Sequence, residues 1–256
     1  MTSPRTFYYF NDPNYPIQVT QSTCEITPNT FMSNNQLWEN ASIRQFFLAV
    51  KHYAEKIYPS TVVDIGAQSG LYSLYAKFLP NTTFYAFEPF PDTYRLLQDN
   101  LALNGITNVK TFPLGISNEN GMTTLNTCLH NNGLNTMGTN VEQMRFQDIH
   151  PINVQVVTLD SQFFEKNIRV DFIKIDTEGW EYAILQGGMK TIEAYHPFIQ
   201  LEWNHANMLQ SRVTENMLCE LLENIDYIEI SSVDEEKLFG WKHHPFMHQK
   251  SQEFYD

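Results

Sequence analysis

Short apolar runs recur through the middle of the chain. Residues 61–66 (TVVDIG) and 83–88 (TFYAFE) are rich in β-branched and aromatic side chains and too short for helices, which is typical of buried parallel strands. Residues 169–176 (RVDFIKID) and 197–203 (PFIQLEW) repeat this pattern. The same reasoning predicts further strands at residues 108–112, 154–160, 227–230 and 237–241.

Helical patterns separate these runs. From Ile43 the apolar positions follow the i, i+3, i+4, i+7 spacing of an amphipathic helix, which Asn40 or Ser42 can cap and Pro59 stops. A second helix has Pro91 in its first turn and ends at Asn104-Gly105. Further helices are predicted at residues 71–79 and 180–195 and around residues 217–222.

Strands that alternate with helices predict an α/β fold, with a twisted, mainly parallel sheet and helices on both faces. We expect residues 61–256 to form one globular unit and residues 1–60 to be a helical and irregular extension packed on it. The start of this extension is rich in Pro, Asn and Thr, which predicts an irregular segment that can contain a short strand pair. Residues 113–152 are polar, and so long a connection in a compact domain is usually functional or mobile.

The composition narrows the class of protein. The chain has 256 residues, 16 Lys and Arg against 29 Asp and Glu, and a formal net charge of −13. Its length suits one domain, and its acidic balance disfavours nucleic acid as a partner, because phosphate contacts need a basic face. Three widely spaced cysteines (Cys24, Cys128, Cys219) fit a reducing compartment. We find no signal peptide and no apolar run long enough to span a membrane, so we expect a cytoplasmic protein.

The turn after the first strand has the character of a ligand-binding turn. In DIGAQSG (residues 64–70), Gly66 and Gly70 bracket a tight bend, and glycine lets backbone approach a ligand closely. Gln68 stands where the middle glycine of a GxGxxG motif would be, which disfavours a pyrophosphate ligand. The alternative is that the two glycines serve strand–helix packing alone.

An acidic residue at the end of the second strand adds to this interpretation. Glu88, followed by Pro89, stands where a carboxylate accepts hydrogen bonds from both ribose hydroxyls of a nucleoside. The alternative is an exposed glutamate before a turn. A glycine turn and this acid within one βαβ unit together indicate a nucleoside cofactor.

Four segments resemble the FkbM family of S-adenosylmethionine-dependent methyltransferases: VVDIGAQSGLYSLYA, FYAFEPFPDTYRLLQDNLALNG, VTLD and DFIKIDTEGWEYAILQGG. The likeness runs from about residue 61 to residue 204. It implies a Rossmann-like class I methyltransferase fold, in which a seven-stranded sheet ends in a reversed β-hairpin. It also implies S-adenosylmethionine as the cofactor and S-adenosylhomocysteine as the product.

The resemblance implies roles for particular residues. The first strand and its turn would lie near the methionine part of the cofactor, Glu88-Pro89 would hold the ribose, and residues after the third strand would flank the adenine. Gln68 departs from the family, in which Asn is commoner. Residues 1–60 and 127–150 carry no family pattern, and we expect them to shape the acceptor site. The cofactor residues are thus Asp64, Gly66, Gln68, Gly70, Glu88, Pro89, Gly115 and Ile116.

An alcohol that accepts a methyl group needs a base to remove its proton. The candidate bases follow the fourth and fifth strands and are Asp176, Glu178, Glu202 and His205. Helix capping is the alternative for the first two, and a surface position for His205. Asp176, Glu202 and Asn204 are also hard oxygen ligands that suit Mg²⁺. We expect no metal, because three oxygens at strand ends arise readily without one.

The sequence therefore predicts an S-adenosylmethionine-dependent O-methyltransferase that acts on a sugar, a glycan or a similar small polyol. One alternative is an NAD(P)-dependent reductase on a similar sheet, which the missing middle glycine and the lack of a Tyr-x-x-x-Lys pair placed for hydride chemistry disfavour. The other is a non-catalytic module that keeps the cofactor fold. We expect a small-molecule or glycan acceptor, no nucleic acid and no membrane span.

Overall fold

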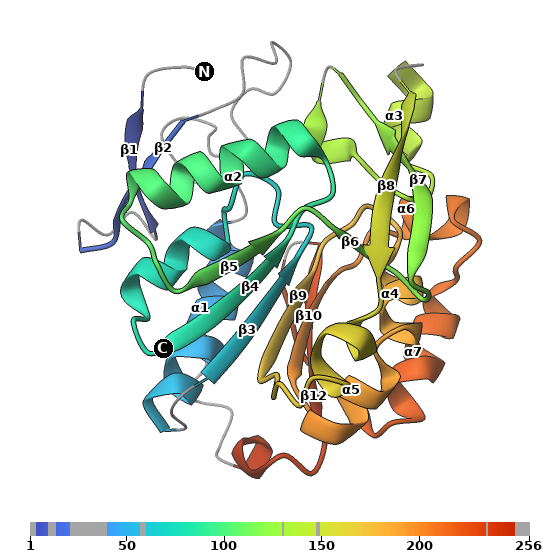
Figure 1. Ribbon diagram of the computed structural model, residues 1–256. Helices are drawn as coiled ribbons and strands as arrows, with labels where there is room; N and C mark the ends of the chain where they lie inside the picture. The colour runs from blue at the N-terminus through green and yellow to red at the C-terminus, as the bar shows by residue number, and fades with distance from the viewer. Residues whose placement is uncertain are drawn as a thin grey trace.

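A computed structural model of the chain describes residues 4–9, 14–20, 40–56, 60–129, 131–146, 149–233 and 235–248. At its centre is a seven-stranded sheet in the order β11-β12-β10-β9-β3-β4-β5 (Figure 1). Its strands are β3 (Ser60–Ile65), β4 (Thr82–Phe87), β5 (Val109–Phe112), β9 (Phe172–Ile175), β10 (Phe198–Glu202), β11 (Tyr227–Val233) and β12 (Glu236–Trp241).

The strand directions confirm the predicted fold class. Pairs among β10, β9, β3, β4 and β5 are parallel, whereas β12 runs antiparallel to both β10 and β11. The two late strands therefore form the reversed hairpin at one edge of a mainly parallel sheet. In such a sheet the carboxyl ends of the parallel strands share one edge, where ligands bind.

Helices cover both faces, as predicted. Successive strand residues point to opposite faces, so Val62 belongs to one buried core and Val63 to the other. The first core lies under α1 (Asn40–Lys56), α2 (Pro91–Leu103) and the 3₁₀ helix η2 (Ser73–Phe78). The second lies under α4 (Glu181–Gln186), α5 (Met189–Tyr195), α7 (Glu215–Glu223) and the π-helical turn η4 (Asp160–Phe164). Two further short helices, α6 (His205–Gln210) and η5 (Pro245–His248), follow β10 and β12.

Two predicted helices differ in the structure. The predicted helix at residues 71–79 is the shorter 3₁₀ helix η2, in which the four residues from Ser73 to Ala76 are all buried. The predicted helix at residues 180–195 is broken into α4 and α5 at Gly187-Gly188. A Cβ at Gly187 would lie 2.1 Å from the Ser117 carbonyl oxygen, so this close backbone contact requires the glycine.

The long polar stretch is more ordered than predicted. It contains β6 (Gly115–Ile116), β7 (Gly121–Thr127), the 3₁₀ turn η3 (Asn132–Leu134) and α3 (Val141–Phe146). With β8 (His150–Val157), which begins four residues before the predicted strand, these strands form a second sheet in the order β6-β8-β7. Figure 1 shows this sheet beside the main one, with α3 above it.

The N-terminal extension packs on the first core. The predicted strand pair is present as β1 (Arg5–Tyr8) and β2 (Pro16–Val19), which run antiparallel. Tyr9 is fully buried against Phe47 and Tyr75. Cys24 and the predicted helix stop at Pro59 lie outside the described residues. Within the described ranges, every helix is too short or too polar to cross a membrane.

Candidate active site

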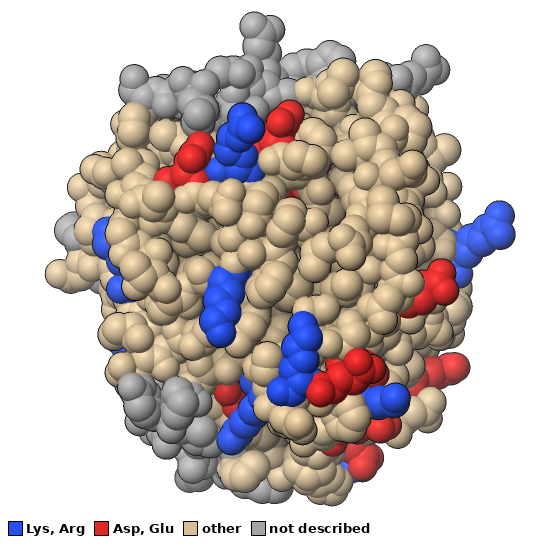
Figure 2. Space-filling model, in the orientation of Figure 1, with Lys and Arg blue, Asp and Glu red and all other residues tan. Residues whose placement is uncertain are grey.

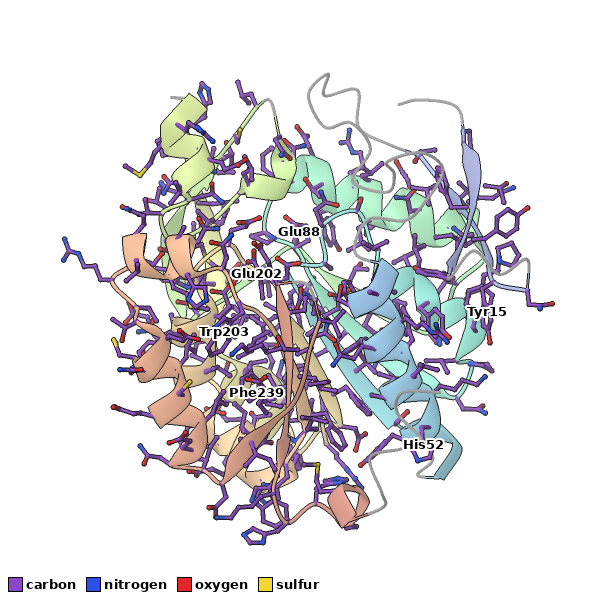
Figure 3. All side chains as sticks on the ribbon, turned by 180° about the vertical axis from the view of Figure 1, so that it is seen from behind. Tyr15, His52, Glu88, Glu202, Trp203 and Phe239 are labelled. Atoms are coloured by element: carbon purple, nitrogen blue, oxygen red, sulfur yellow. The ribbon has the colours of Figure 1, made fainter. Side chains whose placement is uncertain are left out.

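Four acidic residues gather at the carboxyl edge of the parallel strands. Asp64 is the next-to-last residue of β3, Glu88 follows β4, Asp176 follows β9, and Glu202 ends β10. Figure 3 labels Glu88 and Glu202, which lie at the same end of the sheet. The topology therefore brings together the two halves of the predicted site.

The turn after β3 adopts the conformation that its glycines allow. Gly66 has φ +77° and Gly70 has φ +101°, both in the left-handed region. Gln68 between them also has a positive φ, +49°. A positive φ is uncommon for residues other than Gly, Asn, Asp and His, so the turn holds Gln68 in an unfavourable backbone conformation.

Glu88 is buried beside this turn. One carboxylate oxygen accepts the Gln68 backbone N–H at 2.9 Å, and the other accepts the Phe90 N–H at 2.8 Å. Pro89 has no N–H, so the Phe90 N–H is the first one available after Glu88. Burial raises the pKa of Glu88 to about 7, although the two N–H donors oppose this shift. The carboxylate is thus fixed in orientation, and each oxygen can still accept another hydrogen bond.

Asp64 supports the turn from beneath. Its side chain is 2% exposed, and its Oδ2 accepts a hydrogen bond from Ser73 Oγ at 2.5 Å. Burial raises the pKa of Asp64 to about 6, against the opposing effects of Ser73 and the Lys174 ammonium. Asp64 is therefore a nearly fully buried carboxyl group, one oxygen of which is held by Ser73.

Gly115 and Ile116 form β6, next to β8. Ile116 is fully buried in the second core, so its side chain is a packing residue. A Cβ at Gly115 would lie 3.1 Å from Met137 Sδ, and Met137 and Phe90 both pack against the small core of Leu125, Val154 and Val156. Met137 is therefore an apolar neighbour of the predicted adenine position that the sequence analysis missed.

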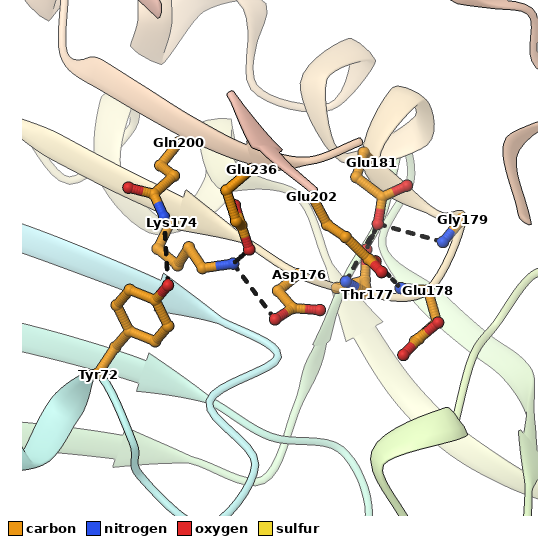
Figure 4. Close-up of polar contacts among 10 residues, drawn as sticks. All are labelled: Tyr72, Lys174, Asp176, Thr177, Glu178, Gly179, Glu181, Gln200, Glu202 and Glu236. Carbon is orange, nitrogen blue, oxygen red and sulfur yellow. Dashed lines mark hydrogen bonds and ion pairs between the residues drawn. The ribbon is translucent and has the colours of Figure 1, made fainter. Parts of the chain in front are cut away.

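Three of the candidate bases lie together. Oxygens of Asp176, Glu178 and Glu202 are all within 4.8 Å of one another, and each side chain is partly buried (Figure 4). The Glu178 N–H donates to Glu202 Oε2 at 3.1 Å. Burial, reinforced by the charges of Glu178 and Asp176, raises the pKa of Glu202 well above its ordinary value. We refer to these three residues as the acid group.

A buried lysine contacts one member of the acid group. Lys174 Nζ lies 3.2 Å from Asp176 Oδ2 and 2.5 Å from Glu236 Oε1, and it lies over the Tyr72 ring at 4.9 Å. Figure 4 shows this ammonium between the two carboxylates. A buried ammonium needs such partners, because desolvation of an unpaired charge is expensive. Lys174 therefore holds one oxygen of Asp176 in place.

Glu178 and Glu181 are held by different donors. Glu178 Oε2 accepts the side-chain amides of Asn140 and Asn207, each at 2.7 Å. Glu181 is buried, and its Oε1 accepts the Thr177 N–H and Oγ–H. Burial raises the pKa of Glu181. Glu181 thus caps the turn after β9. The sequence analysis gave this capping role, as an alternative, to Asp176 or Glu178.

His205 is not part of the acid group. Its side chain is 63% exposed, and its Nδ1 lies 3.5 Å from a Glu215 oxygen. Asn204, considered above as a metal ligand, instead caps α6 by accepting the Ala206 and Asn207 N–H groups at 3.1 Å. The three-oxygen set at this edge therefore contains Glu178 in place of Asn204.

The acid group has the hard oxygens that a divalent cation prefers. One oxygen of each carboxylate, however, already accepts an N–H: from Lys174 on Asp176, from two asparagines on Glu178, and from the Glu178 backbone on Glu202. These hydrogen bonds fix one oxygen of each carboxylate, and the Lys174 ammonium beside Asp176 disfavours a second positive charge there.

Sequence reasoning missed the residues that support the acid group. Lys174 and Glu236 meet across β9, β10 and β12, and Asn140 comes from the polar stretch before β8. The sequence did contain a sign of the ion pair at Lys174, because a lysine within an apolar strand needs a buried partner. Asn140 carried no such signal, because it lies in a stretch already dense in asparagine.

On the face shown in Figure 2, charged side chains are scattered in small groups, as expected for a solvated surface.

Comparisons with known proteins find similarity to methyltransferases. A family model described as "Methyltransferase FkbM domain" matches residues 64–229. The chain is similar to "Methyltransferase 1" of Beauveria bassiana (strain ARSEF 2860), with 30% identity over 144 residues that cover 50% of this chain and 58% of that protein. It is also similar to "Methyltransferase sdnD" of Sordaria araneosa, with 29% identity over 153 residues that cover 49% of this chain and 59% of that protein. The matches thus span less than two thirds of either relative's length.

A solved structure, that of Methyltransferase FkbM from Methylobacillus flagellatus KT, has a TM-score of 0.48 and 18% identity to this chain. The superposition covers 71% of this chain and 43% of that one.

Proposed function

The chain belongs to the FkbM methyltransferase family, and we propose that it transfers a methyl group from S-adenosylmethionine to a hydroxyl of a sugar or similar small polyol. The observation that carries this proposal is the position of Glu88. Its buried carboxylate directly follows β4 beside a glycine turn, at the edge of the sheet that also carries the acid group.

The residues at this edge fit a nucleoside cofactor. Glu88 would accept the two ribose hydroxyls, since each of its oxygens already takes one backbone N–H and can take a second donor. The turn through Gly66 and Gly70 would approach the methionine part, and the backbone of Gly115 would lie beside the adenine. When bound, S-adenosylmethionine supplies an electrophilic methyl group.

The acid group would take the proton of the acceptor hydroxyl. Three carboxylates so close together repel one another when all are ionised, which favours uptake of a proton. Carboxylate and amide groups also suit the several hydroxyls of a polyol as hydrogen-bond partners. His205 receives no catalytic role in this proposal, because its imidazole is exposed and contacts Glu215.

Two measurements test the proposal. Calorimetry should show that wild-type protein binds S-adenosylmethionine and that Glu88→Ala binds it about 10- to 100-fold more weakly, since charge-assisted hydrogen bonds are lost. Glu119→Ala, which changes an exposed glutamate, is the control. Equal affinity in Glu88→Ala would contradict the cofactor site.

The second measurement addresses the reaction. The protein is incubated with labelled S-adenosylmethionine and a panel of free and nucleotide-linked sugars, and methylated product is sought by mass spectrometry. Product with one sugar supports the proposal. Tight cofactor binding without any product would favour a non-catalytic module or an acceptor of another class.

A further inference from the structure

Two buried asparagines from different parts of the chain meet on one oxygen of Glu178. Asn140 precedes α3 and Asn207 lies in α6, and they are 1% and 3% exposed. Each donates its side-chain N–H to Glu178 Oε2 at 2.7 Å. We call this arrangement the amide clamp.

The other ends of both amides are fixed by backbone donors. Asn140 Oδ1 accepts the N–H groups of Glu142 and Gln143, and Asn207 Oδ1 accepts that of Val141. The oxygens must therefore face the start of α3, and only the nitrogens can face Glu178. The orientation of both amides follows from their partners.

The backbone of Glu178 also depends on this packing. Its φ is +57°, an uncommon value for a residue with a side chain. At Gly179 a Cβ would lie 2.9 Å from the Asn207 carbonyl oxygen, so the glycine lets α6 approach this turn. The clamp thus holds the Glu178 carboxylate, and the close approach of α6 restrains the backbone that carries it.

From this geometry we propose that Asn140 and Asn207 are positioning residues that hold the Glu178 carboxylate to receive the acceptor proton, an inference that rests on the function proposed above. In that step the acceptor O–H bond breaks and its proton goes to the Glu178 carboxylate. The electron pair of that bond stays on the acceptor oxygen, which bonds to the methyl carbon. The sulfur–carbon bond breaks at the same time, and its electron pair leaves with sulfur.

The clamp also gives the polar stretch a part in the chemistry. Asn140 belongs to the segment that we expect to shape the acceptor site, and its backbone lies at the start of α3. The segment that contacts the acceptor therefore also fixes the base. Neither asparagine touches the reacting atoms in this proposal, because both act through Glu178.

A double-mutant cycle on Asn140 and Glu178 tests the proposal. Asn140→Asp keeps the Oδ1 acceptor that caps α3 and replaces only the donor, and Asn140→Ala removes the donor without adding a charge. With the sugar that gives product in the panel, we expect either change to lower kcat about ten- to a hundredfold with little change in KM for the cofactor. In a Glu178→Gln background the same changes should alter kcat less than about twofold.

Gln143→Glu is the matched control. Gln143 is a buried amide on the same helix, but it donates to the Asn126 and Leu134 carbonyls and not to Glu178. Its substitution should lower the thermal midpoint and have the same effect on kcat in both backgrounds. An equal effect of Asn140→Asp in both backgrounds would overturn the positioning role. Full activity of Glu178→Gln would instead contradict the proposed function of Glu178.

A readout that needs no acceptor completes the test. In ¹⁵N spectra of the intact protein, Glu178→Ala should shift the side-chain amide signals of Asn140 and Asn207, which are assigned by their loss in the Asp variants. Unshifted signals would overturn the clamp. A panel without product would count against the sugar acceptor alone, and these spectra would still decide whether the clamp exists.

Discussion

Gly66 lies directly against the carbonyl oxygen of Asp176, so close that a Cβ at residue 66 would be 1.9 Å from that oxygen. The turn expected to hold the cofactor and the strand end that carries the acid group are therefore in backbone contact. Neither can move without displacing the other, which keeps the cofactor side and the acceptor side of the site in register.

Substitution of Gly66 should damage stability and binding together. Gly66→Ala adds a methyl group into this contact and forces a side chain onto φ +77°. We expect the free energy of unfolding to fall by about 3 kcal/mol and cofactor binding to weaken strongly. Urea denaturation and calorimetry measure the two effects.

Gly105→Ala is the matched control for this substitution. Gly105 also has a positive φ, +66°, but a Cβ there would meet nothing within 4 Å. Only the backbone strain of about 1–2 kcal/mol should remain, with unchanged cofactor affinity. Equal effects of the two substitutions on binding would show that the contact with Asp176 is unimportant.

Glu88 should make stability depend on pH. Burial raises its pKa from 4.5 to about 7, so the protonated form is favoured in the folded state. The resulting stabilisation is fully present below pH 4.5 and is lost as the pH rises to about 7. Over this window we expect wild-type protein to lose about 3 kcal/mol relative to Glu88→Gln, which cannot ionise. Urea denaturation at a series of pH values measures the difference.

The control for this prediction is Glu119→Gln, which changes an exposed glutamate. Its stability should follow the wild-type pH dependence throughout. If Glu88→Gln also runs parallel to the wild type between pH 4.5 and 7, the side chain of Glu88 is not buried as described.

Removal of metal ions should leave the activity unchanged. Each carboxylate of the acid group already accepts an N–H on one oxygen, and Lys174 places a positive charge beside Asp176. With the acceptor that the sugar panel identifies, turnover after dialysis against EDTA should equal that after dialysis without it. A loss of turnover that Mg²⁺ restores would replace the proton site with a metal site.

The sheet and the residues at its carboxyl edge were predictable because their signals are local. A buried parallel strand is an apolar run, and its carboxyl end is marked by the residue that follows, as for Glu88. The reversed hairpin followed from the family resemblance. These features depend little on which distant segment packs against them.

The remaining differences arise from contacts between distant segments. The predicted helix at residues 180–195 is broken at Gly187, which lies against the backbone of Ser117, just after β6. Asn140 and Asn207 are far apart in the sequence, and neither one alone indicates a contact with Glu178. Their meeting on Glu178 exists only in the folded chain.

Asn100 joins the N-terminal extension to the glycine turn. Its side chain is fully buried in α2, where Nδ2 donates to the Ser69 carbonyl at 2.9 Å and Oδ1 accepts the Thr20 N–H at 2.8 Å. Asn100→Ala should lower the free energy of unfolding by about 2–3 kcal/mol, because buried backbone groups lose their partners. It should also weaken cofactor binding, since Ser69 belongs to the turn.

Asn104, one helical turn later, separates these two effects. It also bridges to the extension, donating to the Gln18 carbonyl at 2.6 Å and accepting the Gln18 N–H at 2.8 Å, but it is more exposed and does not contact the turn. Asn104→Ala should cost about 1 kcal/mol of stability and leave the cofactor dissociation constant unchanged. Because both residues hold the extension and only Asn100 holds Ser69, weaker binding in Asn104→Ala would assign the effect to the extension itself. Weaker binding in Asn100→Ala alone assigns it to the shape of the turn.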